Sequence, residues 1–507
     1  MQAPNIAIRT DATRQIGTGH FMRCLTLAKA LSQLGAKIRF VSRGLPSHLC
    51  EMLAQGSIDL VLLERETEDG TKGCLQHSHW LGCSQEEDAR ITKQAISDRQ
   101  WDWLIVDHYA LDSRWECKLR GSVRRVMVID DLADRQHDCD MLLDQNYYVD
   151  MHTRYSGRVP PKCEMLLGPR YALLREEFKE LRKYARPRTG LVKKILVFFG
   201  GVDAENYTGQ IIKSLAQTDL PGIKVDVVIG AQNPNLEEIE AACAELEYVC
   251  HVQTDRMAEL TAEADVAIGA GGSAIWERCC LGLPSLVFCT AENQRQQLAD
   301  AARHGLVYSV NANGDFALAI QRHLAALVEN QSLREFLSSR GMDLVNGFGT
   351  ERVVSSMGIS DIGIRQADTT DSRALYQWRN DPSIREVSRD NKEIEWSSHL
   401  SWFETLLADP DRFLLIGLRG RTPVGVVRFD RQADAAEISI YTLPGLANRG
   451  VGQCLLRRAE MWLKDHHPDI RRIRAQILGN NSRSHKMFFG AGYETESTCY
   501  EKRMQQP

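Results

Sequence analysis

The sequence lacks several features that would by themselves indicate a location or a class of partner. It contains no apolar run long enough to span a bilayer, and Met1 to Pro4 lead directly into a short strand-like segment instead of a charged region before a hydrophobic stretch. We therefore expect no membrane contact and a cytoplasmic location. The formal net charge is only −5, so the charge balance gives no reason to expect nucleic acid as a partner. A small soluble substrate is expected instead.

Metal-binding patterns are also missing. The chain has 14 cysteines but no Cys-x-x-Cys pair, which argues against structural zinc and favours small buried thiols in a reducing compartment. The adjacent acids Asp130 and Asp131 follow a strand-like run, where acidic residues commonly cap helices or hydrogen-bond within turns. The sequence therefore predicts no metal. Low-complexity segments and repeats of solenoid period are absent too, which excludes a repeat architecture.

The length and the strand pattern indicate a modular α/β protein. A chain of 507 residues exceeds what one hydrophobic core usually spans. Short β-branched runs alternate with stretches of helical period, a pattern typical of parallel sheets. The runs form two series, 6–8, 38–41, 104–107 and 126–130, then 195–199, 225–229, 266–268 and 286–288. We expect two Rossmann-like halves with a cleft between them.

Two interruptions mark the predicted boundaries. A polar, proline-containing stretch at 182–194 separates the two series, and a Gly, Ser and Thr-rich stretch at 347–361 precedes a new strand-like run at 362–365. The predicted domains are therefore 1–185, 186–358 and 359–507.

The first candidate site is a glycine loop that leads into a helix. Gly17-Thr18-Gly19-His20 follows the strand-like run 5–9, and apolar residues then recur at helical spacing. Backbone N–H groups at a helix N-terminus attract anions, and the positive end of the helix dipole favours the neutral imidazole. A neutral His20 can accept a proton as a general base. The alternative is that His20 only caps the helix or contacts a phosphate.

The second candidate site lies after strands of the second series. Gly269-Ala270-Gly271-Gly272-Ser273 offers backbone amides to a diphosphate, and Glu277 lies early in the following helix, where it can accept ribose hydroxyls. The loop at Gly200-Gly201-Val202-Asp203 is a second phosphate-facing turn, and Asn293-Gln294 offers amides to sugar hydroxyl or acetamido groups. The alternative for the glycine loops is that they serve packing alone.

Together these segments resemble one family. The motifs are Arg9-Thr10-Asp11, Ile16-Gly17-Thr18-Gly19-His20 with Arg23-Cys24, Val106-Asp107-His108-Tyr109, Ile129-Asp130-Asp131, Leu167-Gly168-Pro169, Phe199-Gly200-Gly201-Val202-Asp203, and Gly271-Gly272-Ser273 with Trp276-Glu277-Arg278. They span residues 5 to 345 in order and resemble the UDP-2,4-diacetamido-2,4,6-trideoxy-β-L-altropyranose hydrolases of pseudaminic acid biosynthesis.

The resemblance implies a fold, a reaction and roles for residues. The fold would be GT-B-like, related to nucleotide-sugar glycosyltransferases, with water as the acceptor. His20 would activate water at the anomeric carbon, Asn293 and Tyr109 would position the sugar, and Gly272, Ser273 and Glu277 would hold UDP. Asp11, Gly19, Arg23 and Gly201 are also assigned to the substrate site. Amides around the phosphates and one base would suffice without a divalent ion.

The last third of the chain carries a second set of motifs. They are Trp378-Arg379-Asn380-Asp381, His399 with Trp402, the strand-like runs 425–429 and 436–441, Arg449-Gly450-Val451-Gly452-Gln453 before a helix at 454–464, and Asn481 with Ser484, Phe488, Gly492 and Tyr493. They resemble the GNAT acetyltransferase superfamily. The resemblance implies acetyl-CoA as cosubstrate, with Arg449, Gly450, Gly452, Gln453 and Asn481 at the coenzyme. A surface turn is the alternative for the glycine loop.

Two positions depart from the acetyltransferase pattern. Ala447 stands where the loop often begins with Gln or Arg, and Phe488 stands where many members have a tyrosine general acid. Tyr441 or Tyr493 would replace that acid, or the thiolate would take its proton from water. Glu437 is the candidate for deprotonating the amine through water, and its alternative is a solvent-facing strand residue.

The two resemblances together imply consecutive reactions. The C-terminal domain would acetylate the 4-amino group of UDP-4-amino-4,6-dideoxy-N-acetyl-β-L-altrosamine, and the N-terminal pair would then release UDP. Two alternatives remain open: a GT-B glycosyltransferase that passes the sugar to an acceptor, and a non-catalytic nucleotide-sugar sensor. The expected partners are UDP-sugars only, and the expected state is a monomer or a small homo-oligomer.

Overall fold

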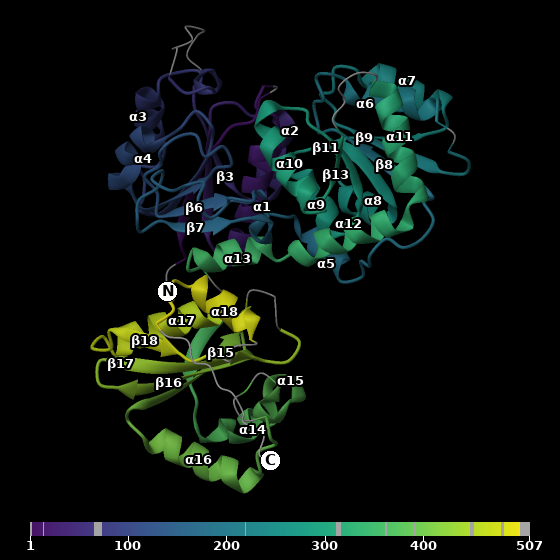
Figure 1. The fold of residues 1–507 in the computed structure, drawn as a ribbon. Helices are drawn as coiled ribbons and strands as arrows, with labels where there is room; N and C mark the ends of the chain where they lie inside the picture. The colour runs from purple at the N-terminus through teal and green to yellow at the C-terminus, as the bar shows by residue number, and fades with distance from the viewer. Residues whose placement is uncertain are drawn as a thin grey trace. The chain divides into compact units, whose positions relative to one another are not determined.

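The computed structural model describes residues 3–13, 15–64, 74–218, 220–310, 316–359, 362–386, 388, 391–446, 451–477 and 481–496. By its internal contacts the chain divides into two compact units, Met1–Val353 and Val354–Pro507 (Figure 1). The predicted boundaries at 185/186 and 358/359 stay predictions. None of the described helices combines the length and the apolar character needed to cross a membrane.

The first unit begins with a parallel sheet in the order β3-β2-β1-β4-β5-β6-β7. Its strands are β1 (Asn5–Thr10), β2 (Lys37–Ser42), β3 (Asp59–Leu62), β4 (Trp101–Asp107), β5 (Val123–Ile129), β6 (Met141–Asp144) and β7 (Glu164–Leu167). Strand β1 pairs in parallel with both β2 and β4, so the strand order reverses between β1 and β4. In such sheets, ligands bind outside the carboxyl ends of the strands at this reversal.

A second parallel sheet in the same unit has the order β10-β9-β8-β11-β12-β13. Its strands are β8 (Lys194–Phe198), β9 (Lys224–Ile229), β10 (Val249–Val252), β11 (Val266–Ala270), β12 (Ser285–Phe288) and β13 (Tyr308–Val310). Here the order reverses between β8 and β11. Both faces are buried, because Leu196 packs into one hydrophobic cluster and its neighbours Ile195 and Val197 pack into another.

Helices connect these strands as parallel crossovers require. They are α1 (Gly19–Gln33), α2 (Ser47–Gln55), α3 (Gln85–Ala95), α4 (Ser113–Leu119), α5 (Glu176–Arg182), α6 (Tyr207–Ala216), α7 (Leu236–Glu245), α8 (Met257–Glu263), α9 (Ala274–Cys280), α10 (Arg295–Arg303), α11 (Phe316–Glu329), α12 (Gln331–Leu344) and α13 (Gly349–Ser356). The buried Trp276 of α9 donates its indole N–H to Asn146 Oδ1 at 3.0 Å, which joins the second half to the loop after β6.

The second unit has one sheet in the order β14-β15-β16-β17-β18. Its elements are β14 (Ile362–Gln366), α14 (Ser372–Asn380), α15 (Pro382–Arg385), α16 (Trp396–Ala408), β15 (Arg412–Arg419), β16 (Thr422–Gln432), β17 (Ala435–Thr442), α17 (Val451–His466), β18 (Arg472–Ala475) and α18 (Ser482–Phe489). Along β16, Val427 faces the cluster that contains α17, and Val426 faces the cluster that contains α16. Helices therefore cover both faces.

This sheet changes strand direction at its last pair. Strands β14 to β17 are antiparallel, whereas β17 and β18 are parallel, with described pairing from Ala435 to Ile438. From Ser439 to Thr442 the described pairing of β17 is with β16. The predicted fold, two Rossmann-like halves followed by an α/β domain, is confirmed.

Candidate functional site

His20 lies in the first turn of α1, directly after the loop that follows β1. Gly17 in that loop has a φ of +75°, a left-handed conformation that glycine adopts without strain. The His20 side chain is largely buried, and its Nδ1 lies 2.5 Å from Oδ1 of Asp107, the last residue of β4. Because β1 and β4 are neighbours at the strand reversal, the sheet itself brings the imidazole and the carboxylate together.

Asp107 is fully buried and accepts from Arg23 and Cys24 as well as contacting His20. Arg23, one turn after His20 in α1, donates from Nε to Oδ2 at 2.6 Å and from Nη2 to Oδ1 at 2.7 Å. Burial alone raises the pKa of Asp107, but the charges and hydrogen bonds of Arg23 and His20 outweigh it and hold that pKa well below its usual range. The ionised carboxylate can accept a hydrogen bond from Nδ1–H of His20, and in that tautomer Nε2 carries no proton.

Tyr109 and Asp131 extend this network. Tyr109 donates its hydroxyl to Asp131 Oδ1 at 2.5 Å, and Arg23 Nη1 approaches Asp131 Oδ2 at 3.2 Å. The rings of Tyr109 and His20 meet edge to face, with centroids 4.5 Å apart. Three residues assigned to the site from sequence, His20, Arg23 and Tyr109, therefore lie together. The sequence analysis assigned neither Asp107 nor Asp131 to the site, because nothing local indicates which imidazole or guanidinium they contact.

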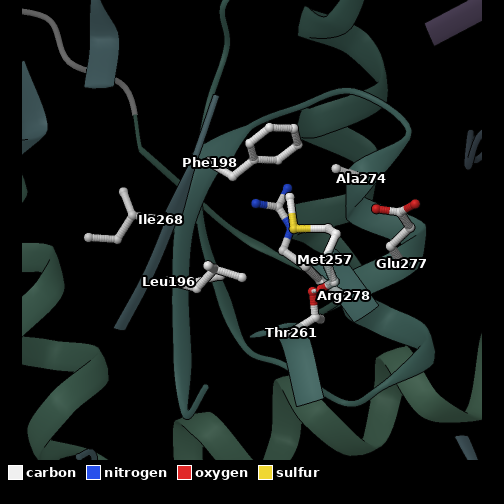
Figure 2. Close-up of a pocket in the computed structure, with 9 residues that line it drawn as sticks. Leu196, Phe198, Met257, Thr261, Ile268, Ala274, Glu277 and Arg278 are labelled. Carbon is white, nitrogen blue, oxygen red and sulfur yellow. Dashed lines mark hydrogen bonds between the residues drawn. The ribbon is translucent and has the colours of Figure 1, made fainter. Parts of the chain in front are cut away.

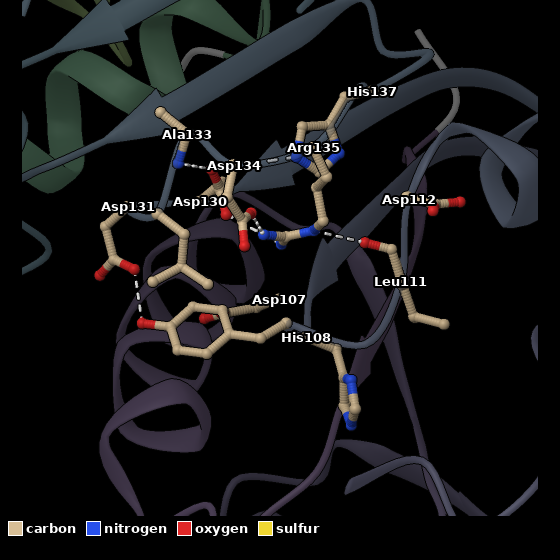
Figure 3. Close-up of polar contacts among 12 residues, drawn as sticks. Asp107, His108, Leu111, Asp112, Asp130, Asp131, Ala133, Asp134, Arg135 and His137 are labelled. Carbon is tan, nitrogen blue, oxygen red and sulfur yellow. Dashed lines mark hydrogen bonds and ion pairs between the residues drawn. The ribbon is translucent and has the colours of Figure 1, made fainter. Parts of the chain in front are cut away.

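Asp130 and Asp131 differ in what they contact. Arg135 pairs with Asp130 Oδ1 at 2.8 Å, and the backbone N–H of Ala133 donates to Oδ2 at 2.9 Å. Figure 3 shows the Asp130 carboxylate facing Arg135 and the Asp131 carboxylate turned the other way. No cluster of His, Cys, Asp and Glu able to hold a metal ion occurs among the described residues. The expected absence of a metal stays a prediction.

An aromatic group that sequence reasoning missed flanks His20. Trp80, at the end of the short 3₁₀ helix η1 (Ser78–Trp80), stacks on Tyr109 with centroids 5.6 Å apart. His77 packs against Trp80 with centroids 4.4 Å apart. Aromatic faces commonly bind the apolar faces of ligands. The sequence around Trp80 has neither strand nor helix periodicity, so only the fold places it here.

Asp11 is enclosed by protein groups. It accepts from Arg9 Nη1 at 2.6 Å and from the backbone N–H of Arg43 at 2.7 Å, and His108 Nε2 lies 3.2 Å from its other oxygen. Burial raises its pKa, but Arg9 and His108 outweigh burial and keep the pKa well below the usual range. The side chain is 2% exposed. Asp11 is thus buried among protein groups that hydrogen-bond its carboxylate, and its assignment to the substrate site stays a prediction.

The loop after β8 reaches the His20 loop. A Cβ built on Gly201 would lie 3.9 Å from Thr18 Oγ1, the residue that precedes Gly19. On its other side, a Cβ built on Gly230 would lie 2.2 Å from the carbonyl oxygen of Gly201. Gly19 itself has nothing within 4 Å of an added Cβ. The predicted phosphate-facing turn at Gly201 therefore lies next to the loop that precedes His20. The backbone of Gly230 packs closely against this turn.

This close approach gives a testable prediction. Replacing Gly230 by Ala forces a methyl group onto a backbone carbonyl that cannot rotate away, so we expect the free energy of unfolding to fall by about 1–3 kcal/mol. UDP affinity should fall with it, because the Gly201 loop must move. Denaturant unfolding of the variant and calorimetric titration with UDP measure both. Gly190→Ala is the control, since an added Cβ there meets nothing within 4 Å; equal stability of the two variants would contradict the prediction.

The remaining nucleotide-site residues lie at the carboxyl ends of β11 and β12. Ser273 precedes α9 and is exposed, and Glu277 in α9 keeps 21% of its side chain exposed while accepting from Arg175 at 3.2 Å. Gly272 has open space, with only Gln294 Nε2 at 4.0 Å from an added Cβ. Asn293 lies exposed in the 3₁₀ helix η4 (Glu292–Gln294). All four are accessible to a ligand at the edge that the sequence indicated.

In the second unit, Glu437 lies on the paired part of β17, half-buried, in register with Asp430 on β16 and Arg474 on β18. Tyr441 lies near the carboxyl end of β17, in register with Val426 on β16, and burial raises the pKa of its hydroxyl. Tyr493, the other tyrosine considered as general acid, donates its hydroxyl to the Glu460 carboxylate at 2.7 Å.

The predicted coenzyme residues are only partly described. Arg449, Gly450 and the departure at Ala447 lie outside the described residues. A Cβ on Gly452 would lie 3.1 Å from Met487 Sδ, and Gln453 donates from Nε2 to the carbonyl of Gly490 at 3.2 Å. Asn481 caps α18 by accepting from the backbone N–H of Ser484 at 3.1 Å. These contacts link α17 to α18; the roles at the coenzyme stay predictions.

Comparison with known proteins addresses both units. Residues 194–312 match the family model of the Glycosyltransferase family 28 C-terminal domain, and residues 372–493 match that of the Acetyltransferase (GNAT) family. An uncharacterized protein of Methanocaldococcus jannaschii is 25% identical over 513 residues, 96% of each chain. The UDP-2,4-diacetamido-2,4,6-trideoxy-beta-L-altropyranose hydrolase of Campylobacter jejuni is 25% identical over 307 residues, 59% of this chain and 97% of its own.

Among solved structures, MurG of Acinetobacter baumannii aligns with a TM-score of 0.48 at 14% identity, covering 70% of this chain and 99% of that one. The resemblance of the first two thirds to the hydrolase, and that of the last third to GNAT acetyltransferases, are both confirmed by the sequence comparisons.

Proposed function

We propose that this chain, which joins a glycosyltransferase-like sugar-nucleotide enzyme to an acetyltransferase domain, makes a precursor of pseudaminic acid in two steps. The second unit transfers acetyl from acetyl-CoA to the 4-amino group of a UDP-amino-sugar. The first unit then hydrolyses UDP-2,4-diacetamido-2,4,6-trideoxy-β-L-altropyranose to UDP and the free sugar. The observation that carries the proposal is the pair of His20 and Asp107, which leaves Nε2 of His20 as a proton acceptor at the ligand edge of the sheet.

The hydrolytic step uses groups that the fold already orients. A water molecule gives a proton to His20 Nε2 as its oxygen attacks the anomeric carbon. The bond from that carbon to the phosphate oxygen breaks, and UDP leaves with the electron pair. Asp107, held by Arg23, stabilises the imidazolium that forms. Backbone amides at Gly201 and Gly272 receive the diphosphate, and Tyr109 beside His20 contacts the sugar.

The acetyl transfer step is assigned to β17, the strand that carries Glu437 and Tyr441. The amine nitrogen attacks the thioester carbonyl, the carbon–sulfur bond breaks, and coenzyme A leaves as a thiolate. Glu437 takes the proton of the amine through water, and Tyr441 near the carboxyl end of β17 returns a proton to the thiolate. Phe488 is buried and carries no hydroxyl, which is why Tyr441 is preferred as the acid.

The proposal is tested with the purified full chain and the UDP-4-amino-sugar, with and without acetyl-CoA. Free thiol and UDP are followed together by mass spectrometry. We expect thiol release first and UDP release that depends on acetyl-CoA. Thiol without UDP would contradict the hydrolase step, and UDP without thiol would leave the second unit without its proposed substrate.

A glycosyltransferase is the second candidate for the first unit. It is supported by the match of residues 194–312 to the C-terminal domain of a glycosyltransferase family. That half would bind a sugar nucleotide in either reaction, so the match does not separate the two. UDP release in the absence of any acceptor separates the two reactions. A rate that rises with an added sugar or lipid acceptor, and that is near zero without it, would favour the transferase.

A further inference from the structure

Asn146, in the loop after β6, has hydrogen-bond partners in both halves of the first unit. The residue is buried, with 7% of it exposed. Its Oδ1 accepts the indole N–H of Trp276 at 3.0 Å, and its Nδ2 donates to Asp131 Oδ2 at 3.2 Å. An indole N–H can only donate, so Oδ1 must face Trp276 and Nδ2 is left to face the carboxylate. Asn146 therefore connects α9 of the second half to the loop after β5.

Asp131 connects Asn146 to the residues around His20. Its Oδ1 accepts the Tyr109 hydroxyl at 2.5 Å, and Arg23 Nη1 lies 3.2 Å from Oδ2, the oxygen that Asn146 also contacts. Both of these side chains lie against the imidazole. The Tyr109 ring meets it edge to face, and Arg23 Nη2 lies 3.3 Å from His20 Nδ1. A shift of Asp131 would therefore displace two side chains that flank the proposed base.

The helix at the other end of this network, α9, is anchored in the second half. Trp276 is fully buried in a hydrophobic cluster of that half. Figure 2 shows Glu277 and Arg278 on the same helix, and Arg278 Nη2 donates to the carbonyl of Ala270 at the end of β11 at 2.8 Å. Glu277, the residue next to Trp276, is the proposed contact of the ribose. The helix proposed to bind the nucleotide therefore also holds Asn146.

We propose that Asn146 is a positioning residue for UDP release: from α9 it holds Asp131, and therefore the side chains that flank His20. The inference rests on the proposed hydrolysis of the UDP-sugar and adds a residue to that site. Reacting groups stay in productive geometry only when surrounding hydrogen bonds fix their rotamers, and small displacements lower the rate. Through this contact, one helix orients both the nucleotide and the groups around the base.

The test uses two substitutions in the full chain. Trp276→Phe keeps a buried ring but removes the N–H that holds Asn146, and Asn146→Ala removes both contacts. We expect kcat for UDP release from the diacetamido UDP-sugar to fall by about tenfold in each variant, the effect of losing one well-placed hydrogen bond. Calorimetric titration should find the affinity for UDP little changed. The double variant should be no slower than Asn146→Ala, because Trp276 acts through Asn146.

Trp101→Phe is the matched control for a purely structural effect. Trp101 is 1% exposed and donates its indole N–H to the carbonyl of Ile96 at 2.8 Å, so the substitution removes the same kind of buried hydrogen bond. It lies at the start of β4, at the opposite end of that strand from Asp107. We expect the denaturant midpoints of Trp101→Phe and Trp276→Phe to fall comparably, but Trp101→Phe should keep the kcat of the unaltered chain.

The outcomes separate this inference from the proposed function. Full kcat per folded molecule in Trp276→Phe and Asn146→Ala, with activity lost in His20→Ala, would overturn the inference and leave the proposed function standing. An equal loss of kcat in Trp101→Phe, or a parallel loss of UDP affinity in Asn146→Ala, would overturn it as well. If the unaltered chain releases no UDP, the proposed function fails and the inference fails with it. Should Asn146→Ala not fold, Trp276→Phe decides.

Discussion

Replacing His20 by Ala is expected to lower kcat for UDP release by about 10²- to 10⁴-fold, the range that general-base catalysis supplies. The affinity for UDP should change little, because the diphosphate is proposed to bind to backbone amides and to Glu277, which the substitution leaves in place. Steady-state kinetics with the diacetamido UDP-sugar and calorimetric titration with UDP measure the two quantities. A loss of kcat with retained UDP binding identifies His20 as the base.

The chain offers a matched control for this experiment. His251 also pairs with an aspartate, Asp226, with Nε2 and Oδ1 2.8 Å apart, but it lies on β10, at the edge of the second sheet. His251→Ala removes the same side chain and the same kind of contact away from the proposed site. Its kcat should match that of the unaltered chain. If His20→Ala retains full activity, His20 has no place in the mechanism and the proposal for the first unit loses its base.

The second large effect is expected for Asp107→Asn. The substitution removes the negative charge that holds Nδ1–H and stabilises the imidazolium, so kcat should fall by about 10²- to 10⁴-fold. Because Asp107 acts through His20, the double variant His20→Ala, Asp107→Asn should be no slower than His20→Ala alone. Additive losses would contradict the proposed coupling. Asp226→Asn is the control for kcat.

Stability must be measured alongside, since Asp107 also neutralises Arg23. Removing one partner of a buried ion pair typically costs about 3–5 kcal/mol, and Asp131, 3.2 Å from Arg23 Nη1, is the carboxylate that remains near this guanidinium. We expect Asp107→Asn to unfold at lower denaturant concentration than His20→Ala. Kinetics are therefore compared at a temperature where circular dichroism reports a folded chain for both variants. A purely structural role for Asp107 would lower stability but leave kcat per folded molecule unchanged.

The sequence indicated the fold with some accuracy because parallel strands buried on both faces are continuous apolar runs. The runs at 6–8, 104–107 and 195–199 lie in β1, β4 and β8. Strands β3, β6, β7, β10 and β13 were not predicted. Each has only three or four residues, too few to form a distinct apolar run, and β3, β7 and β10 also include exposed positions. Their place in the sheet depends on the neighbour that they pair with.

The sequence by itself determined which residue types carry the chemistry. A glycine loop must precede His20 at a helix start, and small residues must precede Glu277, because both are local requirements of backbone conformation and space. Motif order then indicated a sugar-nucleotide enzyme followed by an acetyltransferase. None of these inferences depended on which residues lie on the neighbouring strands of the sheet.

Only the tertiary structure decided which partners these residues meet. Asp107 is 87 positions from His20, and Asp11, assigned to the substrate from its motif, is enclosed by Arg9, Arg43 and His108. Asn146 joins Asp131 to Trp276, which lies 130 positions further along the chain than Asn146. Hydrogen bonds, burial and the resulting charge states arise from contacts between strands and helices that are remote in sequence. The order of the strands in the sheets sets those contacts, and no local pattern records it.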